Sequence, residues 1–333
     1  MQAVVLVGGL GTRLRPLTLT RPKQMLPVGN RPMIERVLEH LAAHGVERAT
    51  LALGYRPDAF ADAYPDGRCA GVDLHYAVEP EPRNTAGAIR FAADDAGIRE
   101  RFVVVNGDVL TDLDLTALVA RHDASGGEGT LALHRVADPS AFGVVPTDAD
   151  GRVIAFVEKP APGEAPTDRI NAGTYVLEPS VLGRIEPDVA VSVERITFPA
   201  MVADGSLYAF DGGDYWIDAG TPSTYLRANI DLLDGTRGAP EVGVHPTASV
   251  AGSTELAWIG AGAAVATGAH VVRSVVLPGA RIGAGAVVRG SILGADSVIG
   301  EGAVLDDDVV VGDGVEVPAG AVLSNGRLAG DAA

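Results

Sequence analysis

A six-residue repeat of aliphatic side chains constrains this fold more than any other sequence feature. Its later positions are six apart, at Leu293, Ile299, Leu305, Val311, Val317 and Leu323. Its earlier positions form trios separated by steps of three to five residues, at Val244, Val250 and Leu256, at Ile259, Val265 and Val271, and at Val276, Ile282 and Val288. A glycine-rich disordered tail would not keep this phase. The period predicts a left-handed parallel β-helix of triangular coils, with the short steps at corners where the register slips.

The preceding two thirds of the chain alternate β-branched runs with helical periodicity. This alternation predicts a Rossmann-like three-layer α/β domain with a mostly parallel sheet. Strands are expected at 3–7, 46–53, 72–78, 102–106, 130–136, 153–157 and 174–177, and helices at 33–44 and from Thr85. Because residues 234–240 resemble a linker, we expect a first domain at 1–236, a β-helix at 243–326 and a tail at 327–333.

Composition excludes several classes of function. The 333 residues carry a formal net charge of −17, which disfavours binding to nucleic acid or anionic membranes. The single cysteine, Cys69, rules out an internal disulfide and favours a reducing cytoplasm. We expect no signal peptide and no membrane span. His40 and His44 lack a third zinc ligand, and Asp306-Asp307-Asp308 lacks calcium-loop spacing and is expected to be an exposed corner.

A glycine-rich loop, Gly8-Gly9-Leu10-Gly11-Thr12-Arg13, directly follows the first expected strand. Phosphate-binding turns occupy this position in α/β domains. Leu14 stands where a dinucleotide fingerprint needs its third glycine, and the Gly-Lys-Ser/Thr of a P-loop is absent. The loop and the residues that follow it contain no acidic residue before Glu35. They contain five basic residues, Arg13, Arg15, Arg21, Lys23 and Arg31. An acid-free basic segment in an acidic chain predicts an anion site suited to a triphosphate.

Lysine is rare in this sequence. Lysine occurs only at Lys23 and Lys159, and the other basic residues are arginines. A compact ammonium group is not equivalent to a guanidinium at a crowded phosphate site. The two lysines are therefore candidate phosphate ligands.

Several motifs together resemble the sugar-1-phosphate nucleotidyltransferases, or nucleotide-sugar pyrophosphorylases, and most closely the mannose-1-phosphate guanylyltransferase branch. The segments that carry the resemblance are Gly8–Thr18, Pro22-Lys23, Pro27–Ile34, Asn106-Gly107-Asp108, Phe142–Val145, Val157–Pro160, Asn171–Tyr175 and Trp216–Pro222. With the hexapeptide domain, the resemblance covers nearly the whole chain. The reaction implied joins a nucleoside triphosphate and a sugar 1-phosphate to give a nucleotide sugar and pyrophosphate, a step of nucleotide-sugar biosynthesis.

The resemblance also implies roles for individual residues. Arg13 and Lys23 would hold the β- and γ-phosphates, Lys159 would hold the sugar phosphate, and Asp108 and Asp218 would bind Mg²⁺. Other nucleotide-binding positions are Gly8, Gly9, Gly11, Thr12, Glu79, Glu81, Asn84, Gly87 and Asp108. The sugar-phosphate positions are Gly143, Glu158, Lys159, Asn171 and Gly173. No protein base is required, because a sugar 1-phosphate is already anionic at neutral pH.

The expected base-contact loop departs from the family pattern. Asn84 replaces a glycine in Glu79–Gly87, although asparagine tolerates left-handed conformations better than most residues. Glu79 or Glu81 could accept from the N1–H and exocyclic amine of guanine, which favours GTP. A solvated loop carboxylate is the alternative for either residue.

The substrate and the role of the β-helix leave alternatives open. The sugar could be mannose, glucose, heptose or a cyclitol, with GTP or another triphosphate. The β-helix could join subunits of a homo-oligomer, since stacked coils leave open ends. It could instead be an acyltransferase that uses His245 or His270, although no loop interrupts the late hexads. A non-catalytic regulatory subunit that binds nucleotide sugars is the third hypothesis.

Overall fold

The computed structural model describes residues 1–213 and 215–330, which form two compact units. The first unit contains Met1–Gly9 and Ile34–Trp216. The second contains Leu10–Met33 and the residues from Ile217 onward. Leu10–Met33, called here the basic loop, therefore shares a unit with the hexapeptide region.

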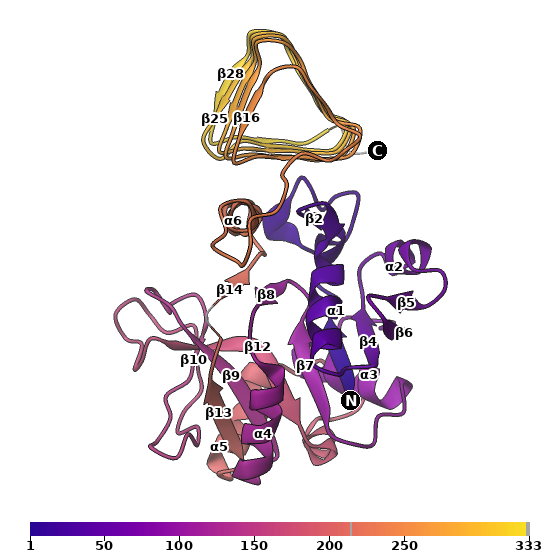
Figure 1. Cartoon of the computed structure of the whole chain (residues 1–333). Coiled ribbons are helices and arrows are strands. Elements are labelled where there is room, and N and C mark those ends of the chain that lie inside the picture. Colours follow the sequence, from indigo (N-terminus) through magenta and orange to yellow (C-terminus); the bar gives the residue numbers. More distant parts are fainter. Residues whose placement is uncertain (214, 331–333) are drawn as a thin grey trace. The chain divides into compact units, whose positions relative to one another are not determined.

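The first unit contains a ten-stranded mixed sheet (Figure 1). Its central strands β7, β1, β4 and β6 are parallel, and β7, β1 and β4 are rich in buried aliphatic residues, as expected of strands covered on both faces. Val4 pairs with Thr50 on one side and with Val104 on the other. The strands of this sheet are β1 (Gln2–Leu6), β4 (Arg48–Leu53), β5 (Arg68–Cys69), β6 (Val72–Val78), β7 (Phe102–Asn106), β9 (Gly129–Arg135), β10 (Gly143–Val144), β11 (Val157–Glu158), β12 (Arg169–Leu177) and β13 (Leu207–Asp211).

The helices of the first domain follow amphipathic segments of the sequence. They are α1 (Met33–Ala43), α2 (Asp58–Ala63), α3 (Asn84–Asp95), α4 (Leu115–Ser125) and α5 (Phe198–Ala203), with a short strand β8 (Val109–Thr111) before α4. Asp114 caps α4 by accepting a hydrogen bond from the Ala117 amide at 2.9 Å, and Gly126 ends it with φ +65°. The expected helices at 33–44 and from Thr85 are thus confirmed to within about one residue.

One expected strand, 153–157, is wrong. Arg152 and Val153 form only isolated bridges, and β11 begins at Val157. Ile154 donates to the Pro146 carbonyl, but Pro146 has no N–H with which to continue the ladder. The pairing therefore ends after one bridge.

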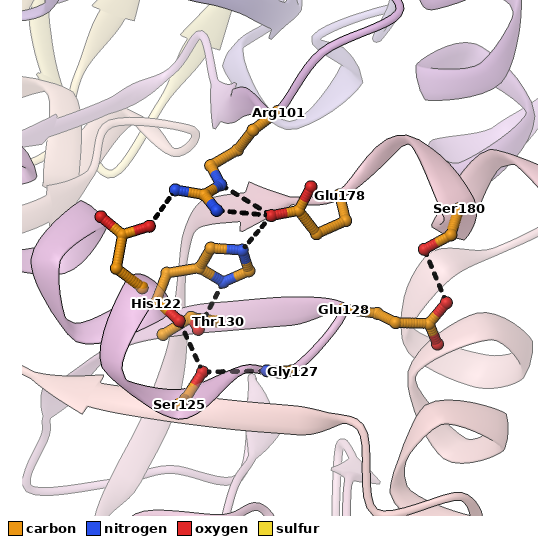
Figure 2. A network of polar contacts seen from close by, with 9 residues as sticks. Arg101, His122, Ser125, Gly127, Glu128, Thr130, Glu178 and Ser180 are labelled. Carbon is orange, nitrogen blue, oxygen red and sulfur yellow. Dashed lines mark hydrogen bonds and ion pairs between the residues drawn. The ribbon is translucent and has the colours of Figure 1, made fainter.

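A polar network fastens α4 to the sheet within the first unit (Figure 2). The His122 ring is 1% exposed and lies between the Thr130 hydroxyl at 2.9 Å and Oε1 of Glu178 at 3.1 Å. The same Glu178 oxygen accepts from Arg101 at 2.7 Å. Burial lowers the pKa of His122, which favours the neutral ring. The hydrogen bonds from Arg101 and His122 outweigh desolvation and lower the pKa of Glu178.

The hexapeptide region forms a left-handed parallel β-helix with three five-stranded sheets (Figure 1). Stacked aliphatic residues fill its interior, for example Ile259, Val276, Leu293 and Val311, which are all at most 1% exposed. Its strands are β15 (Ser249–Val250), β16 (Ser253–Glu255), β17 (Trp258–Ile259), β18 (Ala264–Val265), β19 (His270–Val272), β20 (Val275–Val276), β21 (Arg281–Ile282), β22 (Val287–Arg289), β23 (Ile292–Leu293), β24 (Val298–Ile299), β25 (Val304–Asp306), β26 (Val310–Val311), β27 (Glu316–Val317), β28 (Val322–Ser324) and β29 (Arg327–Leu328).

Two details of the β-helix differ from the sequence expectation. Leu256 does not occupy a stacked position: Thr254 pairs with Val271, and Leu256 lies at the next corner with φ +45°. The inward residues Val250 and Thr254 are four positions apart instead of six, and aliphatic spacing alone does not reveal this shortening. Strand β29 also extends the stack into the expected tail at 327–333, of which residues 331–333 lie outside the described part. Asp307 and Asp308 are exposed at the expected corner, whereas Asp306 is half-buried and ends strand β25.

The second unit also contains α6 (Pro222–Leu233) and the short elements of the basic loop, which are η1 (Thr12–Leu14), η2 (Lys23–Met25), β2 (Pro27–Val28) and β3 (Arg31–Pro32). Asn229 of α6 is fully buried and accepts from the Gly29 amide at 2.8 Å. Its carbonyl accepts from the Trp258 indole at 2.7 Å. The basic loop, α6 and the first coil are therefore linked through one residue. Across residues 1–213 and 215–330, no helix has both the length and the apolar character that crossing a bilayer requires.

Candidate active site

The first part of the glycine loop, Gly8, lies close to two neighbouring segments at the edge of the sheet. A Cβ on Gly54 would lie 3.1 Å from the Gly8 carbonyl oxygen, and a Cβ on Gly8 would lie 3.6 Å from Oε2 of Glu79. Gly9 follows directly and ends this part of the first unit. The missing side chains thus let the loop, the end of β4 and the end of β6 approach closely.

Glu79 and Glu81 have different surroundings. Oε1 of Glu79 is buried and accepts no hydrogen bond from any residue that the structure describes. Burial raises the pKa of Glu79, against the opposing effect of Arg83. Glu81 is exposed. A buried acceptor with an unused lone pair is costly unless a ligand satisfies it, so Glu79 is the better candidate for reading a base.

The departure at Asn84 is accommodated as the sequence suggests. Asn84 has φ +54°, in the left-handed region, and it begins α3. Gly87 has a packing role in the same turn, because a Cβ there would lie 2.7 Å from the Val189 carbonyl oxygen. The Gly87 amide donates to the Val191 carbonyl oxygen at 3.2 Å. Contact of Gly87 with a nucleotide stays a prediction.

Asp108 follows strand β7 at the same sheet edge as the glycine loop. Strands β1 and β7 are parallel, and Leu6 pairs with Asn106, so Gly8 and Asp108 each stand two residues beyond a paired end. The Gly107 amide donates to the Leu6 carbonyl oxygen at 3.0 Å. Asp108 is 8% exposed. Carboxyl ends of parallel strands are the usual ligand edge of such a sheet.

Gly143, Glu158 and Lys159 lie together on the β10–β11 pair. Gly143 pairs with Glu158, and a Cβ on Gly143 would lie 3.0 Å from Oε2 of Glu158 and 2.7 Å from the Phe156 ring. Lys159 has φ +52°, and its ammonium lies 3.7 Å from Oε1 of Glu158. Its side chain is 60% exposed, which leaves the charge accessible to an anion.

Asn171 and Gly173 form a bulge in β12. The Asn171 side chain accepts from the Gly173 amide at 3.1 Å and donates to the Tyr175 hydroxyl at 2.9 Å. Gly173 has φ +73°, and a Cβ there would lie 2.5 Å from Nδ2 of Asn106. Side-chain hydrogen bonds and a required glycine thus fix this segment.

Trp216 lies beside the bulge in β12. It was not among the predicted site residues, although it lies within one of the motifs that carry the resemblance. Its indole N–H donates to the Ala172 carbonyl oxygen at 2.9 Å. Its ring stacks on His134 at 5.5 Å and meets Phe142 edge-on at 5.6 Å. Aromatic faces beside polar groups suit the binding of a sugar ring.

In the second unit, the basic loop brings Gly11 and Lys23 together. Gly11 has φ +62°, and a Cβ there would lie 3.3 Å from Cβ of Lys23. The Thr18 hydroxyl donates to the Gly11 carbonyl oxygen at 2.8 Å, and Thr12 begins η1 directly afterwards. The glycine therefore sets the turn that presents Thr12 and Arg13.

Arg13 and Asp218 also meet within the second unit. Their side chains approach to 3.7 Å, and Oδ1 of Asp218 accepts from the Gly220 amide at 2.8 Å. A Cβ on Gly220 would lie 2.6 Å from the Arg13 guanidinium. The guanidinium of such a pair can bind an anionic ligand, and the carboxylate can bind a cation.

The donor set is sparse for a metal ion. In the described part of the chain, no group of three or more histidines, cysteines or carboxylates is arranged to hold a metal. The rings of His40 and His44 contact each other edge to face, with their centroids 5.0 Å apart. Mg²⁺ typically takes one or two protein carboxylates and completes its shell with phosphate oxygens and water. Asp108 belongs to the first unit and Asp218 to the second, and their joint binding of Mg²⁺ stays a prediction.

Two family models together match nearly the whole chain. Residues 2–235 match the family "Nucleotidyl transferase", and residues 239–329 match "GMPPB C-terminal domain". A mannose-1-phosphate guanylyltransferase of Mycobacterium tuberculosis is 41% identical over 300 residues, 86% of this chain and 83% of that protein. A mannose-1-phosphate guanyltransferase of Schizosaccharomyces pombe is 42% identical over 258 residues, 76% of this chain and 70% of that protein.

Two solved structures share their fold with about two thirds of the chain. HddC from Yersinia pseudotuberculosis superposes with a TM-score of 0.59 and 30% identity, over 68% of this chain and 97% of that one. A putative glucose-1-phosphate thymidylyltransferase from Bacillus anthracis gives a TM-score of 0.62 and 26% identity, over 69% and 94%.

Proposed function

This chain belongs to the nucleotidyltransferase family, and we propose that it transfers the guanylyl group of GTP to mannose 1-phosphate, releasing pyrophosphate and forming GDP-mannose. The similarity to the mycobacterial mannose-1-phosphate guanylyltransferase, 41% over 86% of the chain, carries this proposal. This similarity covers more of the chain than the 68% and 69% that are shared with the two solved structures.

In this mechanism the sugar phosphate oxygen attacks the α-phosphorus of GTP, and the bond to the β-phosphate oxygen breaks. The protein need not supply a general base, because the nucleophile is already an anion. Its task is to hold both anions in line and to compensate their charge. Arg13 and Lys23 hold the β- and γ-phosphates, and the exposed ammonium of Lys159 holds the phosphate of the sugar.

The base is read at Glu79. Guanine presents an N1–H and an exocyclic amine as adjacent donors, which thymine and uracil do not offer to a carboxylate. The buried, unsatisfied Oε1 of Glu79, whose other oxygen Oε2 lies beside Gly8, supports this role. Gly8, Gly9, Gly11 and Thr12 supply backbone amides and close approach for the phosphates.

Asp108 and Asp218 would hold the divalent cation, Mg²⁺. The chemistry it would supply there is compensation of phosphate charge and Lewis acidity toward the α-phosphoryl group. Asp108 is held at the strand edge by the backbone after β7, and Asp218 is oriented by the Gly220 amide.

The sugar is bound by Glu158, Asn171 and the backbones of Gly143 and Gly173. The bulge in β12 and the pairing of Gly143 with Glu158 place polar groups beside the Trp216 ring in the first unit. Glucose, heptose and cyclitol 1-phosphates use the same phosphate contact at Lys159, so the hydroxyl contacts decide among them.

A substrate matrix tests the proposal. Four nucleoside triphosphates are combined with several sugar 1-phosphates, and pyrophosphate release is measured. We expect GTP with mannose 1-phosphate to give the highest kcat/KM. Glu79→Gln should lower kcat/KM for GTP by about tenfold or more through loss of a charged hydrogen bond, whereas the matched control Glu81→Gln should stay within about twofold. A different preferred pair would replace the substrate assignment.

The β-helix joins subunits in this proposal and has no transferase activity of its own. His270 contacts the Ser253 hydroxyl at 2.6 Å and His245 contacts the Thr247 hydroxyl at 2.9 Å, both on the β-helix. We also propose a cytoplasmic location, in keeping with the single, buried Cys69.

A further inference from the structure

We propose that Asp313 of the β-helix is a positioning residue for triphosphate binding, because it holds the basic loop that carries Arg13 and Lys23. We call Thr20, Arg21 and Asp313 the clamp. This inference rests on the proposed function and adds a role for the hexapeptide domain in the reaction itself.

The carboxylate of Asp313 binds the basic loop with one oxygen and the β-helix with the other. Its Oδ2 accepts from the Thr20 hydroxyl at 2.5 Å and from the Arg21 guanidinium at 2.7 Å. Its Oδ1 accepts from the Ala295 amide, one coil earlier, at 2.8 Å. The side chain is only 13% exposed. The backbone of the β-helix therefore fixes the carboxylate in a partly dehydrated place, where a charged hydrogen bond is strong.

The adjacent residue, Gly312, makes room for the basic loop. A Cβ on Gly312 would lie 3.2 Å from Cβ of Pro16. The loop thus rests on the same corner of the β-helix through an apolar contact and an ion pair. Together with the bond from Gly29 to Asn229, these contacts hold the loop on both sides of Lys23.

The acid is specific to one coil. The stacking register makes Ala261, Pro278, Ala295 and Gly330 the equivalents of Asp313 in the other coils, each two residues after a paired strand end. A hexapeptide corner therefore does not need an acid for its own structure. Asp313 occurs at the corner that meets the basic loop.

The clamp also changes the charge of the basic segment. The sequence suggests five cations for the anion site, but Arg21 is ion-paired to Asp313. If charge alone governed triphosphate binding, loss of Asp313 would release Arg21 and strengthen binding. If positioning governs it, loss of Asp313 would loosen the loop, and the triphosphate would have to order it again at a cost in affinity.

The test uses the full chain with Asp313→Asn and Asp313→Ala. Asp308→Asn is the matched control, because Asp308 binds Arg327 at the same 2.7 Å but both residues belong to the β-helix. We expect Asp313 variants to raise KM for GTP by about fivefold or more, with KM for mannose 1-phosphate within about twofold. Amide hydrogen exchange should become faster across residues 10–33 in these variants and not in the control.

Unchanged KM for GTP together with unchanged exchange across residues 10–33 would overturn the inference, and a lower KM for GTP would support the charge explanation against it. If the Asp313 variants lower the melting temperature more than the control does, Thr20→Val gives the same test from the loop side, because it removes a bond to Asp313 without changing any charge and leaves the β-helix intact. Wild-type protein without guanylyltransferase activity would refute the proposed function, while exchange in the loop would still decide whether the clamp exists.

Discussion

At the residue scale, the two proposed metal carboxylates differ in setting. Asp108 is buried at the end of a parallel strand, whereas Asp218 is fixed by a glycine amide beside Arg13. We expect Asp108→Asn and Asp218→Asn each to lower kcat by about a hundredfold or more, because an amide replaces a hard anionic ligand. Pyrophosphate release with and without EDTA measures this, and Asp150→Asn, at an exposed turn, is the control. Full turnover in either variant would remove that residue from the metal site.

The two lysines should separate the two substrates. Lys23 packs against Gly11 in the basic loop, and Lys159 presents an exposed ammonium beside Glu158. Arginine keeps the charge but adds bulk and changes the donor geometry. We expect Lys23→Arg to impair the use of GTP and Lys159→Arg to raise KM for the sugar phosphate, each by about tenfold to a hundredfold in kcat/KM. Steady-state kinetics with each substrate varied in turn measure this, and wild-type parameters in both variants would refute the roles.

Residue types in the sequence predicted some site features and not others. The left-handed turn at Asn84 follows from the preferences of asparagine, and φ +54° agrees with it. The packing role of Gly87 and the pairing of Arg21 with Asp313 could not be predicted, because each depends on a residue about a hundred or more positions away. Local chemistry is visible in a sequence, whereas long-range partners are not.

At the scale of elements, periodicity predicted the repeating parts well. Parallel strands and stacked hexads bury residues at regular intervals, so 72–78 and 102–106 agree with β6 and β7 at both ends. Irregular strand pairings do not bury residues at regular intervals, so the sequence pattern does not reveal them. The expected strand at 153–157 failed at Pro146, and the expected stack at Leu256 failed at a shortened corner. Both errors lie where the repeat of the backbone is interrupted.

The network on α4 should make stability depend on pH. Burial lowers the pKa of His122 below its ordinary value near 6.5, so the unfolded chain binds this proton more readily than the folded one. The stabilisation that neutral His122 contributes is complete above about pH 6.5, and it is lost as the pH falls towards the pKa of His122 in the folded chain. The slope is at most about 1.4 kcal/mol per pH unit for one proton. The pKa of Glu178 is also lowered, from its ordinary value of 4.5. Protonation of Glu178 therefore also reduces the stability of the fold, but in a lower range of pH.

Thermal melting between pH 7.5 and 5 tests this dependence, with those limits set about one pH unit or more on either side of the ordinary histidine value. His122→Gln retains one donor and one acceptor but does not titrate, so its melting temperature should fall less on acidification than that of the wild type. His75→Gln, at an exposed histidine, is the control. Equal slopes in the wild type and His122→Gln would show that His122 does not contribute.

At the scale of the whole molecule, the compact units do not coincide with the domains expected from composition. Composition places a boundary near residues 234–240, whereas contacts place Leu10–Met33 and α6 with the β-helix. The ties are the Asp313 ion pair, the Pro16 contact and the Trp258 bond to Asn229. A sequence boundary follows changes in local pattern, but a structural unit follows tertiary contacts, and only the latter can join a loop near residue 20 to a corner near residue 313.

Removal of the β-helix should therefore change both assembly and nucleotide binding. Light scattering should give a smaller particle for a chain that ends at Thr236 than for the full chain, since the open coil stacks that favour association are gone. The shortened chain also loses Asp313 and Trp258, so it should bind GTP more weakly than full-length Asp313→Asn does. Equal particle sizes would place the subunit contacts in the first 236 residues. Equal GTP affinity in the shortened and full chains would mean that the basic loop holds its shape without the β-helix, because the clamp and the indole bond are both absent from the shortened chain.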